Sequence, residues 1–318
     1  MEDSLKKVFN CGIVPVIKLE NAEDAVPLCG ALLDGGINIA EITFRTAAAA
    51  DSIKNVSESM PDVYVGAGTV TSIDLAKKAI EAGSKFIISP GFNPRVVEYC
   101  LEKEIPIFPG ISSPSDIENA LNYGLKVLKF FPAEANGGLK ALKAMSAPYS
   151  MIRFMPTGGI DASNLLDYLK FDKVIACGGS WMVREDLVKS KNFAEITKIT
   201  KDAVSKMHNF HFAHMAVNSE DQSKAKALTE LFANTFGFGT RETSAGYFAS
   251  ESIEILNTMG HGKNGHIGIR TTNVERAIAY FERLGITLNY STAREKDGKR
   301  TFIYLEDTFG GFDVHIME

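Results

Sequence analysis

The sequence predicts a (β/α)8, or TIM, barrel followed by a smaller α+β domain, and three observations carry this prediction. From residue 13 to about residue 180, short apolar runs alternate with segments of helical periodicity. Beyond residue 207 the alternation gives way to a weak internal repeat, and all six histidines lie there. The chain has 318 residues, more than the ~250 of a typical barrel. We therefore expect domains over residues 1–206 and 207–318.

Eight apolar runs mark the expected barrel strands. Each is short, rich in β-branched residues and closed by Gly or Pro, as buried strands usually are. Strand and helix alternating eight times is typical of a closed parallel barrel. An open doubly wound sheet is the alternative, but the GxGxxG turn it usually carries does not follow the first run. The runs are Ile13–Ile17, Ile39–Phe44, Tyr64–Val70, Phe86–Pro90, Ile105–Ile111, Val127–Pro132, Ile152–Thr157 and Val174–Cys177.

The region after residue 207 carries two similar copies of one pattern. In each copy a short apolar segment, 213–218 or 265–270, precedes a helix-like stretch that ends at a glycine. Each copy then continues into strands, and the copies close with residues 252–256 and 313–317. A period near 50 residues with β-α-β-β order predicts two similar modules.

Composition excludes several classes of partner. The formal net charge of −5 gives no reason to expect nucleic acid. No apolar stretch approaches the ~20 residues that a membrane span needs, so we expect no membrane contact. The polar segment Met1–Lys7 is typical of a helix start and not of a signal peptide. The four cysteines are far apart and form no CxxC pair, which favours reduced thiols in a cytoplasmic protein.

Polar residues alternate with apolar ones along the second run. Pleating points Glu41, Thr43 and Arg45 to one face, and Ile42 and Phe44 to the other. In a barrel the apolar pair would meet the helices, and the polar side chains would line the lumen. Two opposite charges there are costly unless they are paired or used. A structural ion pair and a functional pair both remain open from this motif alone.

Lys129 lies inside the apolar sixth run, where a buried lysine needs a reason. Pleating puts it on the same face as Val127 and Phe131, and apolar neighbours favour the neutral form of an amine. A neutral amine is what attack on a ketone requires. The alternative is a lysine at a strand end whose amine reaches water. We favour the functional interpretation.

Glycine pairs close the last two runs. Gly158 and Gly159 follow the seventh run, and Gly178, Gly179 and Ser180 follow the eighth. Loops after strands seven and eight are the usual phosphate site of a barrel. Glycine lets main-chain N–H groups approach an anion, and the Ser180 hydroxyl adds a donor. One such pair is usually only a turn, but two at these positions predict an anion site.

Seven motifs, one at each of seven strand ends, resemble one known family. Residues 1–206 are similar to the 2-keto-3-deoxy-6-phosphogluconate (KDPG) and 2-keto-4-hydroxyglutarate (KHG) aldolases, which are class I aldolases on a (β/α)8 barrel. The motifs are Glu41–Thr46, Gly66–Val70, Ile88–Gly91, Pro109–Ile111, Lys129–Glu134, Pro156–Ile160 and Gly178–Trp181.

The resemblance assigns a role to each matching position. Lys129 corresponds to the lysine that forms the imine, and Glu41 to the general acid/base that acts through a water. Some relatives carry an arginine that meets the phosphate near the end of the first strand, where this chain has Lys18. The remaining positions are Arg45 and Thr69 for the pyruvate carboxylate, Pro90 and Phe131 for the pocket walls, Thr157 for a substrate contact, and Gly158, Gly159, Gly179 and Ser180 for the phosphate.

The resemblance also implies the reaction and its partners. We expect a lyase that cleaves KDPG to pyruvate and glyceraldehyde 3-phosphate, and KHG to pyruvate and glyoxylate. The covalent lysine imine replaces any metal cofactor in this barrel. The expected partner is a small 2-keto acid, and the expected assembly is a homotrimer. A non-catalytic sugar-phosphate sensor that keeps the pocket is the alternative.

Residues 207–318 resemble the paired βαβββ modules of the glyoxalase and extradiol dioxygenase group, the vicinal oxygen chelate superfamily. In that group, metal ligands come from the first and last strands of each module. The matching positions are His214 and Glu254 in the first module, and His266 and His315 in the second. Such donors suit a divalent transition metal such as Zn, Ni, Mn or Fe. A second, metal-dependent enzyme and a degenerate module with merely polar histidines both remain open.

Overall fold

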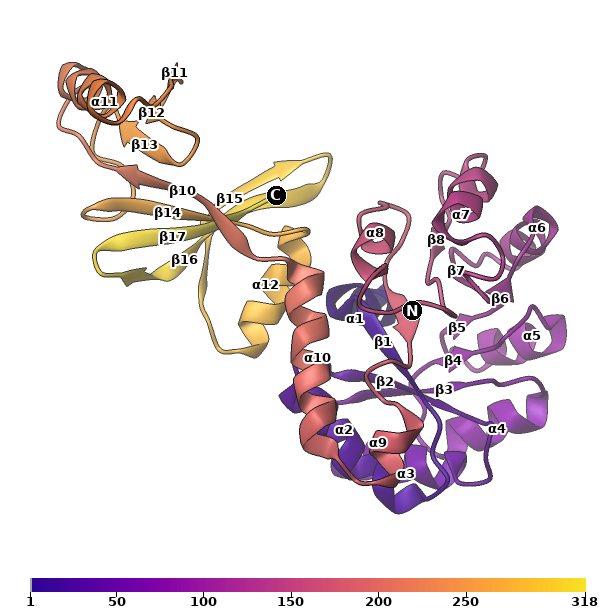
Figure 1. Cartoon of the computed structure of the whole chain (residues 1–318). Coiled ribbons are helices and arrows are strands. Elements are labelled where there is room, and N and C mark those ends of the chain that lie inside the picture. The colour runs from indigo at the N-terminus through magenta and orange to yellow at the C-terminus, as the bar shows by residue number, and fades with distance from the viewer. Residues whose placement is uncertain (1) are drawn as a thin grey trace. The chain divides into compact units, whose positions relative to one another are not determined.

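The structure, a computed structural model, describes residues 2–318. The chain divides into two units, Met1–Met207 and His208–Glu318, and each has its own sheet and helices (Figure 1).

The strands of the first unit all pair in parallel, as expected when helices connect them. Each of the eight predicted runs contains a strand or an isolated bridge. The fifth run is divided at Pro109, which has no N–H to donate to a ladder. The strands are β1 (Ile13–Ile17), β2 (Ile39–Thr43), β3 (Tyr64–Gly68), β4 (Ile87–Ile88), β5 (Ile107–Phe108), β6 (Gly110–Ile111), β7 (Val127–Phe130), β8 (Arg153–Phe154) and β9 (Cys177–Gly179).

These strands form one curled layer. Six of them pair in the order β5-β4-β3-β2-β1-β9, and three in the order β6-β7-β8. Isolated bridges from Phe154 to Val174 and from Thr157 to Gly178 join β8 to the segment that carries β9. The result is a curled parallel sheet, consistent with a TIM-barrel-like fold, and it brings the carboxyl ends of β2, β3 and β7 to one edge.

Helices pack around this sheet, and several start where the sequence supplies a cap (Figure 1). Ser72 accepts a hydrogen bond from the Leu75 N–H, and Ser113 forms a capping box with Asp116. The helices are α1 (Glu2–Cys11), the 3-10 helix η1 (Ala22–Asp24), α2 (Ala25–Asp34), α3 (Ala49–Ser59), α4 (Ile73–Glu81), α5 (Pro94–Glu102), α6 (Pro114–Asn122), α7 (Gly138–Ser146), α8 (Leu165–Leu169), α9 (Glu185–Lys189) and α10 (Phe193–His208).

The second unit contains a mixed eight-stranded sheet. Its elements run β-α-β-β-β twice along the chain, as the internal repeat predicted. The first set is β10 (His211–Val217), α11 (Gln222–Phe236), β11 (Thr240–Glu242), β12 (Gly246–Ala249) and β13 (Ile253–Leu256). The second set is β14 (Gly265–Arg270), α12 (Val274–Arg283), β15 (Leu288–Lys296), β16 (Lys299–Phe309) and β17 (Phe312–Met317).

The two sets meet at the middle of this sheet. The strand order is β11-β12-β13-β10-β14-β17-β16-β15, so the opening strands of the two sets are neighbours. β10 and β14 pair antiparallel, and each pairs in parallel with the last strand of its own set. First and last strands of both sets therefore occupy the four central positions.

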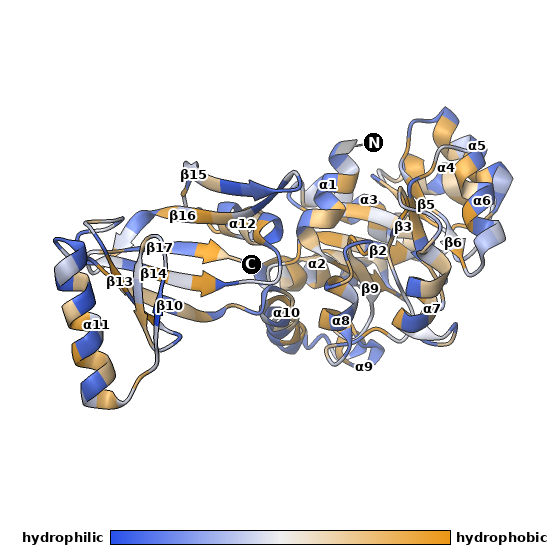
Figure 2. Ribbon diagram, turned by 90° about the horizontal axis from the view of Figure 1, so that it is seen from above, coloured by the Kyte–Doolittle hydropathy of each residue, from blue (hydrophilic) through white to orange (hydrophobic). Residues whose placement is uncertain are grey.

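Each helix of the second unit covers its own half of the sheet with one apolar face. Val274 and Ile278 of α12 are buried against Ile303 and Ile316. The core under α11 is smaller: Ala225 of this helix is buried with Tyr247 and Ile255. Figure 2 shows α11 banded in hydrophobic and hydrophilic segments.

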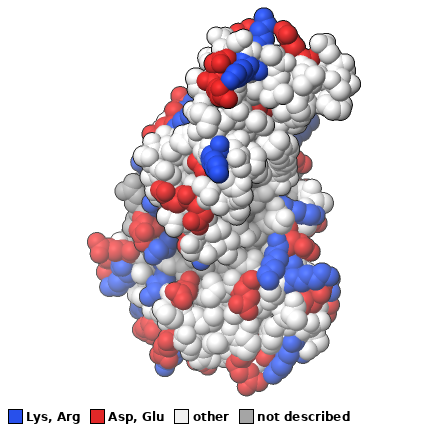
Figure 3. All heavy atoms as spheres, turned by 90° about the vertical axis from the view of Figure 1, so that its left-hand side faces the viewer, with Lys and Arg blue, Asp and Glu red and all other residues white. Residues whose placement is uncertain are grey.

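The surface carries charges of both signs. On the face drawn in Figure 3, Lys and Arg side chains are interspersed with Asp and Glu side chains, and neither sign forms a continuous field. Among residues 2–318, no helix is both long enough and apolar enough to cross a membrane.

Candidate active site

A buried lysine–glutamate pair lies at the centre of the first unit. Lys129 Nζ on β7 is 3.2 Å from Glu41 Oε1 on β2. The Glu41 side chain is fully buried and that of Lys129 is 6% exposed. Nζ also lies 5.1 Å from the centre of the Phe131 ring. Because a buried charge without a partner costs several kcal/mol, each residue requires the other. The expectation that Lys129 is buried beside Phe131 is confirmed, and Glu41 adds a carboxylate to its surroundings.

Gly68 makes room for the Glu41 carboxylate. It pairs with Thr43 across β2 and β3, and a Cβ built on it would lie 2.2 Å from Glu41 Oε1. Any other residue at position 68 would displace the carboxylate. Gly68 lies in the motif Gly66–Val70, but its contact with Glu41 was not predicted, because that contact depends on strand register.

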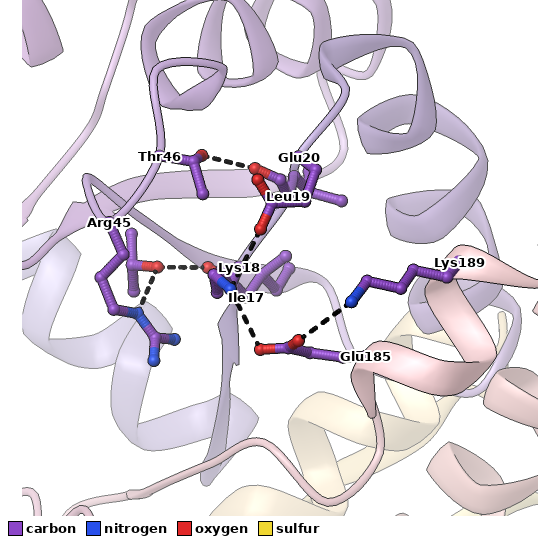
Figure 4. Close-up of polar contacts among 9 residues, drawn as sticks. Ile17, Lys18, Leu19, Glu20, Arg45, Thr46, Glu185 and Lys189 are labelled. Atoms are coloured by element: carbon purple, nitrogen blue, oxygen red, sulfur yellow. Dashed lines mark hydrogen bonds and ion pairs between the residues drawn. The ribbon is translucent and has the colours of Figure 1, made fainter.

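Arg45 lies just beyond the strand that carries Glu41 (Figure 4). β2 ends at Thr43, and Arg45 is exposed. β2 therefore ends two residues before Arg45, but a hydrogen bond keeps the Arg45 side chain beside Thr43. Arg45 Nε donates to Thr43 Oγ1 at 3.0 Å, and Thr43 Oγ1 donates to the Ile17 carbonyl at 2.7 Å. The sequence analysis assigned no role to the Thr43 hydroxyl. It holds Nε of the Arg45 guanidinium and leaves the two terminal nitrogens to bind another partner.

Three further predicted residues lie within two residues of strand ends at this edge. Thr69 follows β3, Pro90 lies two residues after β4, and Phe131 follows β7; all three are half-buried. Thr69 has a φ of 58°, a left-handed conformation that costs a non-glycine residue about 1–2 kcal/mol. Strain of this kind persists only where the surroundings hold it, and it is concentrated at functional sites.

The two glycine loops lie side by side, because Thr157 and Gly178 form a parallel bridge. Gly158 and Gly159 have φ values of 97° and 79°, a conformation that L side chains rarely adopt. Within residues 2–318, the main-chain N–H groups of Gly158, Gly159 and Ser180 donate to no protein acceptor. The Ser180 hydroxyl is exposed next to them. Free amides on adjoining loops are the elements of an anion cradle.

Lys18 lies between two carboxylates directly after β1 (Figure 4). Its Nζ is 3.0 Å from Glu20 and 3.3 Å from Glu185, and Glu185 is in turn 3.5 Å from Lys189. Hydrogen bonds to Glu20 and Glu185 raise the pKa of Lys18 above its usual value. A phosphate that reaches Lys18 would therefore compete with Glu20 and Glu185.

Comparison with known proteins matches residues 3–199 to a family model described as KDPG and KHG aldolase. The chain belongs to this family. The 2-dehydro-3-deoxy-phosphogluconate aldolase of Treponema pallidum is 47% identical over 192 residues, which is 60% of this chain and 91% of that protein. The KHG/KDPG aldolase of Escherichia coli K12 is 44% identical over 202 residues, 63% of this chain and 95% of that protein.

Solved structures of the family share this fold. The KDPG aldolase of Legionella pneumophila, with pyruvate captured at low pH as a covalent carbinolamine, matches with a TM-score of 0.61 at 38% identity. That match covers 63% of this chain and 97% of the Legionella chain. The Zymomonas mobilis enzyme with 3-phosphoglycerate matches with a TM-score of 0.58 at 36% identity. The chain is therefore an aldolase, a lyase, and these similarities concern its first unit.

The substitution Thr69→Gly tests separately the backbone strain at position 69 and the contribution of the Thr69 hydroxyl to substrate binding. Glycine adopts a positive φ without steric cost, so the free energy of unfolding should stay level or rise by up to about 1 kcal/mol. Loss of the Thr69 hydroxyl should raise KM for the keto acid. The matched control is Glu104→Gly, because Glu104 has a φ of 55° and lies in the loop before β5. An unchanged KM in Thr69→Gly would remove the role of Thr69 in binding.

A second cluster of polar side chains lies in the second unit. The structure brings together all four residues that the sequence analysis selected there. His214 Nε2 is 3.1 Å from His266 Nε2 and 3.4 Å from His315 Nε2. Glu254 Oε2 is 3.6 Å from His214 Nε2 and 3.7 Å from His266 Nε2. Because the four come from β10, β13, β14 and β17, the cluster lies on the four central strands.

Burial sets the protonation of this cluster. Desolvation lowers the pKa of His266 to about 4 and that of His315 to about 3, and it also lowers the pKa of His214. The imidazoles are therefore neutral at pH 7, and their contacts with Glu254 are not ion pairs. Desolvation raises the pKa of Glu254, and the charge of Arg241 opposes this rise. Neutral imidazoles with converging Nε2 atoms are the form that binds a metal.

Proposed function

We propose that the first unit, over residues 1–206, is a class I aldolase that cleaves KDPG to pyruvate and glyceraldehyde 3-phosphate, and also KHG to pyruvate and glyoxylate. The observation that carries the proposal is the buried contact between Lys129 Nζ and Glu41 Oε1, 3.2 Å apart. A buried amine next to a carboxylate that can accept and return protons can carry out imine chemistry. We further propose that the curled sheet is a closed (β/α)8 barrel.

Lys129 opens the reaction as a nucleophile. Lys129 gives a proton to Glu41, and its amine then attacks C2 of the 2-keto acid. The resulting carbinolamine loses water to give a protonated imine. Glu41 lies within hydrogen-bond reach of Nζ, so it can take up the proton of the amine and return one to the leaving hydroxyl. The protonated imine then draws electrons from the C3–C4 bond.

Glu41 also serves the cleavage step. Through a water it removes the proton of the C4 hydroxyl, the C3–C4 bond breaks, and the aldehyde leaves. The electron pair of that bond forms the enamine, which is reprotonated at C3, and hydrolysis of the pyruvate imine frees Lys129. The second carboxylate oxygen, Oε2, is buried and accepts no hydrogen bond from residues 2–318, so it is available to such a water.

The other predicted residues would hold the two ends of the substrate. Arg45 and Thr69 would bind the carboxylate of the substrate. Thr43 holds Arg45 in position, and the guanidinium fork suits the planar carboxylate. Thr157 Oγ1 is buried without a protein partner and would donate to the substrate. Pro90 and Phe131 would form the walls, and Gly158, Gly159, Gly179 and Ser180 would cradle the phosphate. The free amides of the two glycine loops support the phosphorylated substrate over KHG.

Trapping with borohydride tests this proposal directly. The full-length protein is incubated with pyruvate, reduced, digested and mapped by mass spectrometry. We expect one covalent adduct, on Lys129. An adduct on another lysine, or no adduct together with normal cleavage, would contradict the imine mechanism.

For residues 207–318 we propose a pair of βαβββ modules like those of the vicinal oxygen chelate group, with a divalent transition metal held by His214, Glu254, His266 and His315. The distances support a tetrahedral site. With metal–nitrogen bonds of about 2.05 Å, neighbouring ligand atoms lie about 3.3 Å apart. Four of the six separations among these ligand atoms run from 3.1 to 3.7 Å, and the three histidine nitrogens lie within 4.8 Å of one another. Such an ion would polarise a bound oxygen as a Lewis acid.

Metal analysis checks this second proposal. Purified without chelators or metal-affinity resin, the protein should carry about one transition-metal ion per chain. His266→Ala should lose the metal. The control is His211→Ala, because His211 is an exposed histidine on β10 outside the cluster. Equal metal content in both variants would leave the site without support.

Two properties of the whole chain complete the proposal. The four cysteines are buried and none forms a disulfide within residues 2–318, which supports a reducing, cytoplasmic location. We also propose a homotrimer, so light scattering should give about three times the chain mass of 34.6 kDa, and a monomer mass would contradict it.

A further inference from the structure

Three consecutive carbonyl groups of the loop after β8 are each held by a donor outside that loop. Main-chain N–H groups of the segment after β7 hold the first two, at 2.8 Å from Ala133 to Thr157 and at 3.0 Å from Glu134 to Gly158. The third carbonyl, that of Gly159, accepts a hydrogen bond from the side-chain amide of Asn164 at 2.9 Å. Asn164 is therefore the one donor of the three that a substitution can remove.

Holding these carbonyls also orients the N–H groups of the loop. In a planar trans peptide, the C=O of one residue and the N–H of the next point in opposite directions. The three contacts therefore turn the N–H groups of Gly158, Gly159 and Ile160 away from the donors that hold the carbonyls. Within residues 2–318, none of these three N–H groups donates to a protein acceptor. The Ile160 N–H is thus a third free donor beside the two glycine amides.

Asn164 is itself held in one orientation. It lies directly before α8, where Leu165, Tyr168 and Leu169 are buried, and its own side chain is half-buried. Its Oδ1 accepts a hydrogen bond from the Asp161 N–H at 3.0 Å, while its Nδ2 donates to the loop carbonyl. Because both ends of the amide are bonded, the side chain bridges two main-chain groups and fixes the turn between the loop and α8.

A second contact from α8 holds the segment after β7 against the same loop. The Tyr168 hydroxyl donates to the Glu134 carboxylate. Burial, together with the nearby Glu134, raises the pKa of Tyr168, so the phenol keeps its proton and can donate at neutral pH. A Cβ built on Gly159 would lie 2.6 Å from Glu134 Cβ, so this segment packs directly on the glycine loop. Through Asn164 and Tyr168, α8 therefore holds both partners of the contact.

We propose that Asn164 is a positioning residue for the phosphate end of the substrate: it holds the Gly159 carbonyl so that the Ile160 N–H joins the two glycine amides in binding phosphate. Donors that are oriented before the anion arrives need no reordering when it binds. Asn164 acts through the main chain and does not touch the substrate. The inference rests on the proposed function, since it takes this loop as the phosphate site, and it makes Asn164 a determinant of the preference for phosphorylated keto acids.

Kinetics of full-length Asn164→Ala test the proposal with one substrate that carries a phosphate and one that does not. KM for KDPG should rise about tenfold, and so should the inhibition constant of inorganic phosphate, because a hydrogen bond to a charged group contributes at least that factor. The kcat for KDPG and the rate of borohydride trapping with pyruvate, which has no phosphate, should stay within about twofold of the parent values. A purely structural role of Asn164 would lower the trapping rate as well.

Asn55→Ala is the matched control. Asn55 on α3 is also half-buried, and its Nδ2 donates to the main-chain carbonyl of Ala22 at 3.2 Å. The variant therefore loses the same kind of hydrogen bond away from the glycine loop. We expect KM for KDPG and the inhibition by phosphate to be those of the parent.

Several outcomes would overturn the inference. An unchanged KM and unchanged phosphate inhibition in folded Asn164→Ala would do so, and so would a loss of trapping as large as the loss of phosphate binding. If circular dichroism shows that the alanine variant does not fold, Asn164→Ser gives the same test, because serine still caps α8 but is one bond too short for the bridge. Failure of the unaltered protein to trap pyruvate would contradict the proposed function instead. A parent enzyme that traps pyruvate but is not inhibited by phosphate would contradict this inference alone.

Discussion

Lys129→Met will lower kcat/KM for KDPG cleavage by about four orders of magnitude or more. Without the amine no imine forms, and neither Glu41 nor the anion cradle can stabilise the carbanion that cleavage produces. Pyruvate release measured in a coupled assay checks this result. The control is Lys126→Met, because Lys126 is exposed just before β7 and should keep normal turnover.

The free energy of unfolding of Lys129→Met must be measured alongside its activity. Methionine at position 129 leaves Glu41 buried without its partner, at a cost of roughly 3–5 kcal/mol. The double variant Lys129→Met/Glu41→Gln removes both charges and should recover most of that stability without recovering activity. If the single variant retained more than about one hundredth of normal turnover while folded, Lys129 would not be the nucleophile.

Glu41→Gln will give the second largest effect, a fall in kcat of about 10²–10⁴-fold with a small change in KM. The amide fits the same space beside Gly68 but cannot accept the proton of the amine or of the C4 hydroxyl. Steady-state kinetics with KDPG measure this directly. The control Glu81→Gln changes an exposed glutamate at the end of α4 and should behave as the parent.

The Glu41→Gln variant also distinguishes between two possible roles of Glu41 in the reaction. If Glu41 serves both imine formation and bond cleavage, the rate of borohydride trapping with pyruvate will fall along with kcat. A full trapping rate with a reduced kcat would restrict Glu41 to the cleavage step. An unchanged kcat would make the buried pair purely structural, which is the interpretation that the sequence also allowed.

Much of the aldolase site was predictable because it follows from local rules. Alternation along β2 and β7 turned Glu41 and Lys129 to the inside, and their positions near strand ends placed them at one edge of the sheet. What escaped prediction depends on where strands stop and how they pair. The end of β2 at Thr43 puts Arg45 outside the strand, and the pairing of Thr43 with Gly68 brings Gly68 against Glu41.

In the second unit, too, some features were predictable from the sequence and others depend on how the strands pair. The four cluster residues could be selected because the resemblance to paired βαβββ modules implies ligands on the first and last strands of each set. The stacks of Arg241 on Phe248 and of Arg294 on Phe302 could not be predicted, since each pair is seven or eight residues apart in the sequence and meets only through strand register. Register between strands is a tertiary property that periodicity does not encode.

Because β10 pairs antiparallel with β14, the two βαβββ halves of the second unit are arranged like the subunits of a dimer, joined in one chain. Each βαβββ half supplies two members of the histidine–glutamate cluster, so neither half holds a complete site. The junction residues 257–264 keep the halves at high effective concentration, and association of the halves becomes part of folding. A slip of one residue between β10 and β14 would turn His214 or His266 to the opposite face and dismantle the shared site. The alignment of these two strands therefore fixes both the dimer-like symmetry and the site.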